Sequence, residues 1–148
     1  MVRTTGSRPA RFLLADRAPE PPPDPVVILR KITAEALILQ DEAEEVLMAI
    51  ARNTPLGLVA PRAGPLTRRF FALADALPAG CADPTCERMC SSLRTIFNHH
   101  AMQLATALDF LAVAGRSDRA AEQLTRIGGL GEPGRVLENH YRQLVALG

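Results

Sequence analysis

Residues 83–114, DPTCERMCSSLRTIFNHHAMQLATALDFLAVA, contain no glycine, and their single proline is Pro84 near the start. Asp83 can accept hydrogen bonds from the first free backbone N–H groups of a helix, and proline suits the first helical position. One face then carries residues at alternating steps of four and three: Cys86, Cys90, Leu93, Phe97, His100, Leu104, Ala107, Leu111 and Ala114. This heptad spacing predicts one long amphipathic helix from Asp83 to Ala114, closed by Gly115.

A second stretch of similar length, from about Pro25 to Asn53, follows the same pattern. Asp24 is a candidate N-cap, and Pro25 suits the first helical position. The stripe on its apolar face consists of Leu29, Ile32, Ala36, Leu39, Ala43, Val46 and Ile50. Because the two helices are long and carry matching stripes, we expect them to pack antiparallel at the centre of a bundle.

The remaining segments predict shorter helices. Residues 54–65 are rich in proline and glycine and are expected to form a loop. A short helix is expected over residues 66–77, a fourth segment is capped by Ser117, and a final helix begins at about Glu132 or Pro133. No stretch alternates as a β-strand does. The sequence therefore predicts an all-α helical bundle with two long antiparallel amphipathic helices plus shorter helices.

The first 24 residues differ in composition from the rest of the chain. Three arginines and no acid occur in residues 1–15, and four prolines follow in residues 19–23. Proline favours extended geometry and lacks the N–H group that a helix needs. We therefore expect residues 1–24 to be a disordered arm and residues 25–148 to form a single helical-bundle domain.

Charge and composition exclude several classes of partner. The 17 basic and 16 acidic residues leave a formal net charge of +1, so nucleic acid and anionic membranes are not expected partners. No apolar run reaches the length of about eighteen residues that predicts a transmembrane helix. Three cysteines, an odd number, indicate a reducing cytoplasm rather than a secreted disulfide framework. Lys31 is the only lysine, and this arginine-rich usage is typical of a high-GC bacterial genome.

The residues best suited to metal or redox chemistry are the three cysteines, Cys81, Cys86 and Cys90. Cys86 and Cys90 lie one helical turn apart on one face, so both thiolates can reach one soft metal ion, zinc or copper. Cys81, from the preceding loop, is a candidate third ligand. The spacing differs from that of a zinc knuckle, and free cysteines on a packing stripe are commonly core residues. A third alternative is redox sensing, in which the helix dipole lowers the pKa of Cys86 and peroxide links it to Cys81.

The histidines form no metal-binding or catalytic motif. Neighbours on a helix point about 100° apart, so His99 and His100 cannot chelate one ion together. The Glu-x-x-His motif of di-iron bundles is absent, because Ile96 and Phe97 stand three residues before them. No nucleophile elbow, P-loop or dinucleotide fingerprint occurs, so we expect no enzymatic activity. A helix-turn-helix interpretation of residues 117–147 remains as a lesser alternative, although its connection is longer than usual.

The stretch from Asn98 to Leu124 resembles the phasin family, the helical proteins of bacterial polyester granules. The similar features are an alanine-rich helix that ends in Leu111-Ala112-x-Ala114, followed by Ser117, Ala121 and Leu124. The glycine run from Gly128 interrupts the pattern where phasins continue a long helix. The resemblance implies a non-enzymatic amphipathic coat or scaffold protein.

Apolar stripes dominate this sequence, and they favour a function in association. We predict a non-enzymatic helical protein that self-associates or binds a protein partner as a scaffold, adaptor or granule coat, with a coiled-coil homodimer as the expected form. The alternative is a cysteine-based metal-binding or redox-sensing protein, and the lesser one is a DNA-binding regulator. The candidate interface residues, which are also candidates for an intramolecular core, are Leu29, Ile32, Leu39, Val46, Phe97, His100, Leu104 and Leu111.

Overall fold

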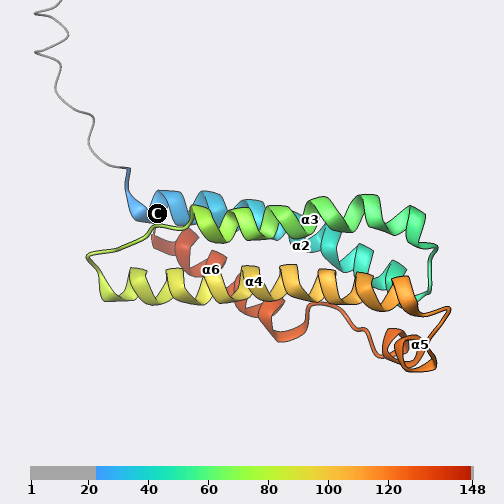
Figure 1. Cartoon of the computed structure of the whole chain (residues 1–148). Helices are drawn as coiled ribbons and strands as arrows, with labels where there is room; N and C mark the ends of the chain where they lie inside the picture. The colour runs from blue at the N-terminus through green and yellow to red at the C-terminus, as the bar shows by residue number, and fades with distance from the viewer. Residues whose placement is uncertain (1–22, 148) are drawn as a thin grey trace, which may run out of the picture.

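The computed structural model describes residues 23–147, and this part of the chain is helical without any strand (Figure 1). The predicted arm, residues 1–24, lies almost entirely outside the described residues. The prediction of an all-α fold is confirmed. The helices are α2 (Pro25–Ala51), α3 (Leu56–Ala76), α4 (Pro84–Val113), α5 (Asp118–Thr125) and α6 (Gly131–Leu147).

The two long helices begin where the sequence predicts. A side-chain oxygen of Asp24 accepts a hydrogen bond from the Val26 N–H at 3.0 Å, and Asp83 does the same for Thr85 at 3.0 Å. A proline occupies the first position of each helix. These caps satisfy backbone donors that have no partner within the helix. They fix the starts of α2 and α4, and the Asp83 cap stands next to the cysteine cluster.

The expected loop over residues 54–65 is wrong, because α3 already begins at Leu56 and contains Pro61 and Pro65. A proline in a helix interior costs about 3 kcal/mol. The segment is helical in spite of this cost, and Val59 and Ala63 extend the apolar stripe of residues 66–77 backwards and are both buried. Burying one aliphatic side chain contributes about 1.5–3 kcal/mol. The apolar character of the segment was the relevant signal, and its prolines obscured it.

The longer α3 changes the arrangement of the bundle. With 21 residues, it carries the chain back along α2, so α4 starts at the end where α2 also starts. Figure 1 shows α2 and α4 running in the same direction, with α3 antiparallel to both. The predicted antiparallel pairing of the two long helices is therefore wrong. The most extensive packing partner of α4 is α3.

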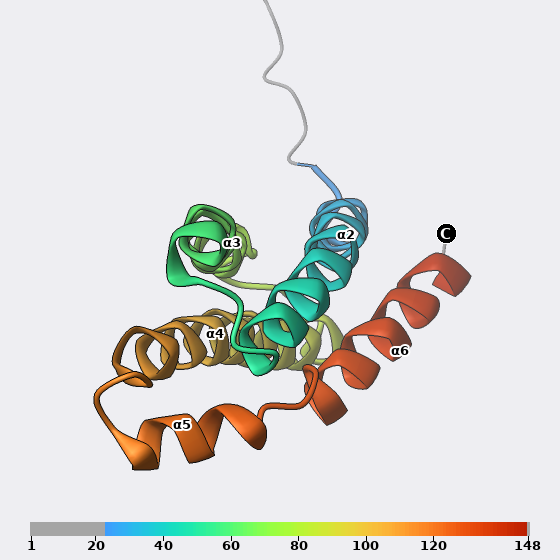
Figure 2. The same cartoon turned by 90° about the vertical axis from the view of Figure 1, so that its right-hand side faces the viewer.

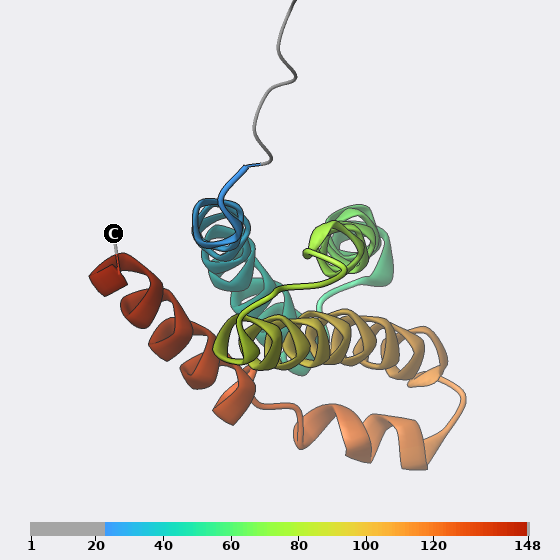
Figure 3. The same cartoon turned by 90° about the vertical axis from the view of Figure 1, so that its left-hand side faces the viewer.

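The last two helices complete the core from the other side. Figures 2 and 3 show α6 crossing α2 and α4 obliquely, while α5 packs against the C-terminal half of α4. Leu137 and Leu144 of α6 and Leu124 of α5 are buried in the common core. Within residues 23–147, no helix has the combination of length and apolarity needed to cross a membrane.

The eight candidate interface residues all lie in the interior of a single chain. His100 and Phe97 are fully buried in α4, and the others are between 0% and 8% exposed. The stripes of α2 and α4 are therefore covered by the chain's own helices. These residues, with their helices, are Leu29, Ile32, Leu39 and Val46 in α2, and Phe97, His100, Leu104 and Leu111 in α4.

Candidate metal centre

The structure brings the three cysteines together. Cys81 lies in the connection between α3 and α4, while Cys86 and Cys90 occupy the first two turns of α4. Their Sγ atoms all lie within 4.8 Å of one another. The Cys81 Sγ is 2.6 Å from the Cys86 Sγ and 3.7 Å from the Cys90 Sγ. All three cysteines are free thiols in this arrangement.

Local structure explains how the cluster forms. The cap Asp83 lies only two residues after Cys81, so Cys81 stands close in the chain to the first turn of α4. Residues four apart on a helix lie on one face, which aligns Cys86 with Cys90. Cys90 is buried at 3% exposure, whereas Cys81 and Cys86 are partly buried. The cluster therefore reaches from the core to the surface.

A cavity of about 270 Å³ adjoins the cluster, between the starts of α2 and α4. Cys81 and Cys86 line it together with Asp24 and Asp83, the two N-cap residues. Two helix N-termini thus face the same cavity, and each carries a partial positive charge from its backbone dipole. The carboxylates of Asp24 and Asp83 stand at the same cavity and oppose the effect of this positive charge on a nearby thiolate.

Two of the thiols, those of Cys86 and Cys90, are hard to ionise. Burial raises the pKa of Cys86 to about 12, and its hydrogen bond with Cys81 adds to the effect. Burial also raises the pKa of Cys90. The expectation that the helix dipole lowers the pKa of Cys86 is therefore wrong, because removal from water and the adjacent thiols outweigh the dipole. The raised pKa opposes a fast-reacting thiolate at Cys86.

The sulfur spacing suits a soft metal ion. Metal–thiolate bonds of about 2.3 Å place neighbouring sulfurs about 3.8 Å apart in a tetrahedral site, and about 4.0 Å apart around a planar three-coordinate ion. The 3.7 Å separation between Cys81 and Cys90 matches, whereas the 2.6 Å separation between Cys81 and Cys86 is shorter than in either geometry and would have to widen on metal binding. Among residues 23–147, no histidine or carboxylate joins this group of ligand atoms.

His100 is a structural residue remote from the cysteines. Its Nε2 lies 2.8 Å from the side-chain oxygen of Gln40, and the Gln40 amide donates to the Gly134 carbonyl at 3.3 Å. The ring also meets Phe70 edge to face, with 5.3 Å between centroids. Burial, followed by the neighbouring charge of His99, lowers the pKa of His100 to about 4. The imidazole is therefore neutral at physiological pH and connects α2, α4 and α6.

Sequence reasoning missed the polar partners of the histidines. Gln40 is only 5% exposed, and the Ser92 hydroxyl lies 2.8 Å from His140 Nε2. Gln40 stands four residues after Ala36 and three before Ala43, which both lie on the apolar stripe. Its helical position therefore indicated that its side chain faces the core. The pairing with His100 was not visible, because the two residues are 60 positions apart in the chain.

The fold and the site together define a helical bundle with a three-cysteine cluster at one end. Comparison of the chain with protein-family models, with curated proteins and with solved structures finds no match. The resemblance to phasins stays a prediction that these comparisons do not test.

Proposed function

We propose that this protein binds one thiophilic metal ion, Cu(I) or Zn(II), through the thiolates of Cys81, Cys86 and Cys90. The observation that supports the proposal is the convergence of three Sγ atoms within 4.8 Å from two segments of chain. Soft thiolate ligands select Cu(I) and Zn(II) over harder ions. The protein would act as a carrier, store or sensor of the metal, without catalysis.

Copper fits this ligand set better than zinc. Cu(I) is satisfied by three sulfur ligands, whereas a structural zinc site has four protein ligands. Among residues 23–147, the group of metal-binding atoms ends at the three sulfurs. Zinc would have to take a fourth ligand from solvent at the adjoining cavity. We therefore propose Cu(I) as the preferred ion and Zn(II) as the weaker one.

The experiment is a titration of the reduced, metal-free protein with Cu(I) in the presence of a colorimetric Cu(I) chelator. We expect one equivalent to be bound, and the Cys81→Ser, Cys86→Ser and Cys90→Ser variants each to lose most of the affinity. Met102→Leu is the matched control, because it removes an exposed sulfur further along α4. A triple-serine variant that competes for copper as well as the wild type would refute the proposal.

Association with a protein partner is the other function that the sequence predicts, and its support is weaker. The stripes that favoured it are buried within one chain. A partner would have to use other surfaces, such as those around Ile38 and Leu58, which are 71% and 67% exposed. Light scattering of the purified protein tests self-association directly. DNA binding remains a prediction without further support.

A further inference from the structure

Cys86 forms part of the wall of two cavities. One is the cavity of about 270 Å³ described above, and the other has a volume of about 40 Å³ and lies between the starts of α2 and α4 and the end of α6. The smaller cavity has room for about one water-sized group. Two of the described residues that line it carry sulfur, Cys86 and Met89, and both belong to the first two turns of α4. A thioether therefore shares a cavity with one of the proposed metal ligands.

Helix geometry places Met89 beside Cys86. Successive residues are turned by about 100° around a helix, so Met89, three positions after Cys86, and Cys90, four positions after it, stand on either side of Cys86. Residues at these spacings have Cβ atoms about 5–6 Å apart. Met89 is partly buried and packs against the core, as Cys81 and Cys86 do. Because a methionine side chain is unbranched and flexible, its Sδ atom can adjust to an ion held by Cys86.

The charge of the site favours a neutral fourth ligand. Three thiolates already exceed the single positive charge of Cu(I), and the carboxylates of Asp24 and Asp83 stand at the adjoining larger cavity. Another anionic ligand would add repulsion at short range. A thioether is soft, carries no charge and suits Cu(I), whereas zinc in proteins takes cysteine, histidine and carboxylate ligands. Met89 therefore offers a contact that Cu(I) would use and Zn(II) would not.

We propose that the Met89 thioether is a fourth and weaker ligand of Cu(I) bound to the three cysteines, and that it makes the site select Cu(I) over Zn(II). The inference rests on the proposed function and adds to it a residue that determines metal specificity. The three thiolates hold the ion, and the Met89 Sδ covers the side of the ion that faces the smaller cavity. Buried apolar residues that line this cavity, among them Leu29 and Leu144, limit the access of water to that side.

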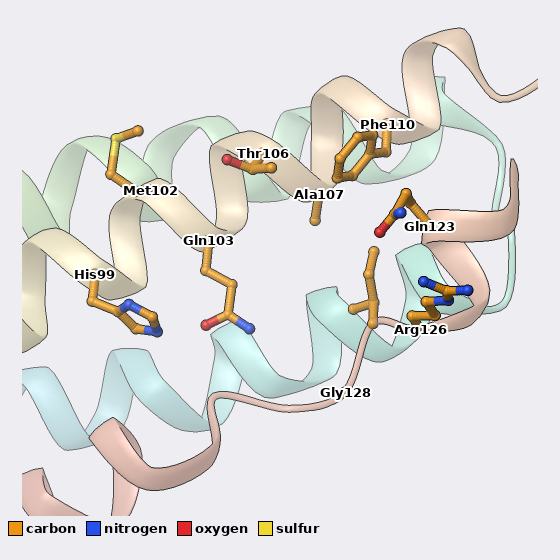
Figure 4. Close-up of a pocket in the computed structure, with 10 residues that line it drawn as sticks. His99, Met102, Gln103, Thr106, Ala107, Phe110, Gln123, Arg126 and Gly128 are labelled. Atoms are coloured by element: carbon orange, nitrogen blue, oxygen red, sulfur yellow. The ribbon is translucent and has the colours of Figure 1, made fainter. Parts of the chain in front are cut away.

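Met102 provides a matched control for the test. It lies on the same helix as Met89, about 20 Å further along the axis. Figure 4 shows it at a cavity of about 400 Å³ beside the C-terminal half of α4. No cysteine is among the described residues that line this cavity, and Met102 is 56% exposed. Replacing Met102 therefore removes a thioether from α4 at a distance from the cysteine cluster.

The first test measures the affinities of the reduced protein for Cu(I) and for Zn(II), each against a colorimetric chelator. Met89→Leu keeps an apolar side chain of similar size and removes the sulfur. We expect this variant to bind Cu(I) about tenfold more weakly and Zn(II) within about twofold of the wild type, while Met102→Leu matches the wild type for both ions. An unchanged Cu(I) affinity in Met89→Leu, or an equal loss for both ions, would mean that Met89 only fills the core, and would overturn the inference.

The second test detects the contact itself and can be read on the wild type alone. Protein that carries selenomethionine in place of methionine is loaded with one equivalent of Cu(I), and X-ray absorption is recorded at the selenium edge. We expect a copper–selenium contact in the wild type and in Met102→Leu, and none in Met89→Leu. Wild-type protein that binds Cu(I) through its cysteines without a copper–selenium contact leaves the proposed function standing and refutes the role of Met89. Wild-type protein that binds no Cu(I) refutes both.

Discussion

At the scale of single residues, the imidazole of His100 is a polar group buried in the core. It is fully buried, its Nε2 is bonded to Gln40, and its Nδ1 has no hydrogen-bond partner among residues 23–147. Charging this ring would place a cation in the core without a counter-ion, which is costly in surroundings of low polarity. The lowered pKa of His100 follows from this burial, and it makes the stability of the fold sensitive to acid.

We predict that stability falls between pH 6.5 and pH 4 because of His100. The folded chain keeps a pKa of about 4, against 6.5 for an ordinary histidine, so the unfolded chain binds the proton first as the pH falls. The contribution of His100 to the free energy of unfolding is fully present above pH 6.5 and is lost as the pH falls to 4. The loss amounts to up to about 3 kcal/mol. Urea unfolding of the wild type and of His100→Gln at several pH values measures the difference. Equal pH dependence in the two proteins would contradict the prediction.

At the scale of elements, α3 forms against its own local preferences. Two prolines and two glycines lie within its first ten residues, yet the segment is helical because its apolar stripe packs on α2 and α4. Helices in proteins gain most of their stability from such packing rather than from intrinsic propensity. The connection between α5 and α6 depends on tertiary contacts in a similar way, since the Leu130 N–H donates to the Glu44 carboxylate at 2.8 Å.

Replacing the second proline of α3 should stabilise the protein. Pro65 is exposed, so Pro65→Ala removes no buried contact and restores one backbone donor to the helix. We expect the free energy of unfolding to rise by about 1–2 kcal/mol, because the helical gain exceeds the added entropy of the unfolded chain. Chemical denaturation measures the change. A loss of stability would show that the proline is needed for the local geometry of α3.

The glycines before α6 provide a matched pair of substitutions. A Cβ at Gly129 would collide with the Glu44 carboxylate, whereas a Cβ at Gly128 would meet nothing within 4 Å. Gly129→Ala should therefore displace Glu44, break its hydrogen bond to Leu130 and speed hydrogen exchange at the Leu130 amide. Gly128→Ala should leave that exchange rate unchanged. Similar rates in both variants would mean that Glu44 does not hold this connection.

At the scale of the whole molecule, the cysteine cluster lies where several helices meet. Val26 and Leu29 of α2, Cys86 of α4 and Leu144 of α6 line one small cavity beside it. The starts of α2 and α4 and the end of α6 therefore share the environment of the proposed metal centre. An ion bound to Cys81 would also tie the connection after α3 to α4. Metal binding at this point should therefore stabilise the whole fold.

We therefore predict that Cu(I) raises the melting temperature of the reduced protein. An ion that binds only the folded state adds about 2.7 kcal/mol when its free concentration is one hundred times the dissociation constant. Cys86→Ser should lose this increase while retaining a cooperative transition in the absence of metal. Differential scanning calorimetry under buffered Cu(I) makes the comparison. An identical shift in the variant would place the metal elsewhere.

Much of this fold was predictable from local patterns. The starts of α2 and α4 follow from Asp-Pro pairs, and their buried faces follow from unbroken steps of three and four. The grouping of three cysteines near one helix start was equally visible. The helical state of residues 56–65 was not predicted. Their prolines and glycines disfavour a helix locally, and the apolar stripe stabilises a helix only once it packs against other helices.

The sequence by itself determined the helical class, the caps and which faces turn inwards, since these depend on residues within a few positions of one another. The tertiary structure decided the direction of α4 relative to α2 and the meeting of Gln40 with His100. It also buries Cys86 in part, and this burial, with the adjacent thiols of Cys81 and Cys90, raises the pKa of Cys86 where the helix position alone predicted a lower one. Contacts between residues far apart in sequence leave no periodic trace, so they become visible only when the helices are packed.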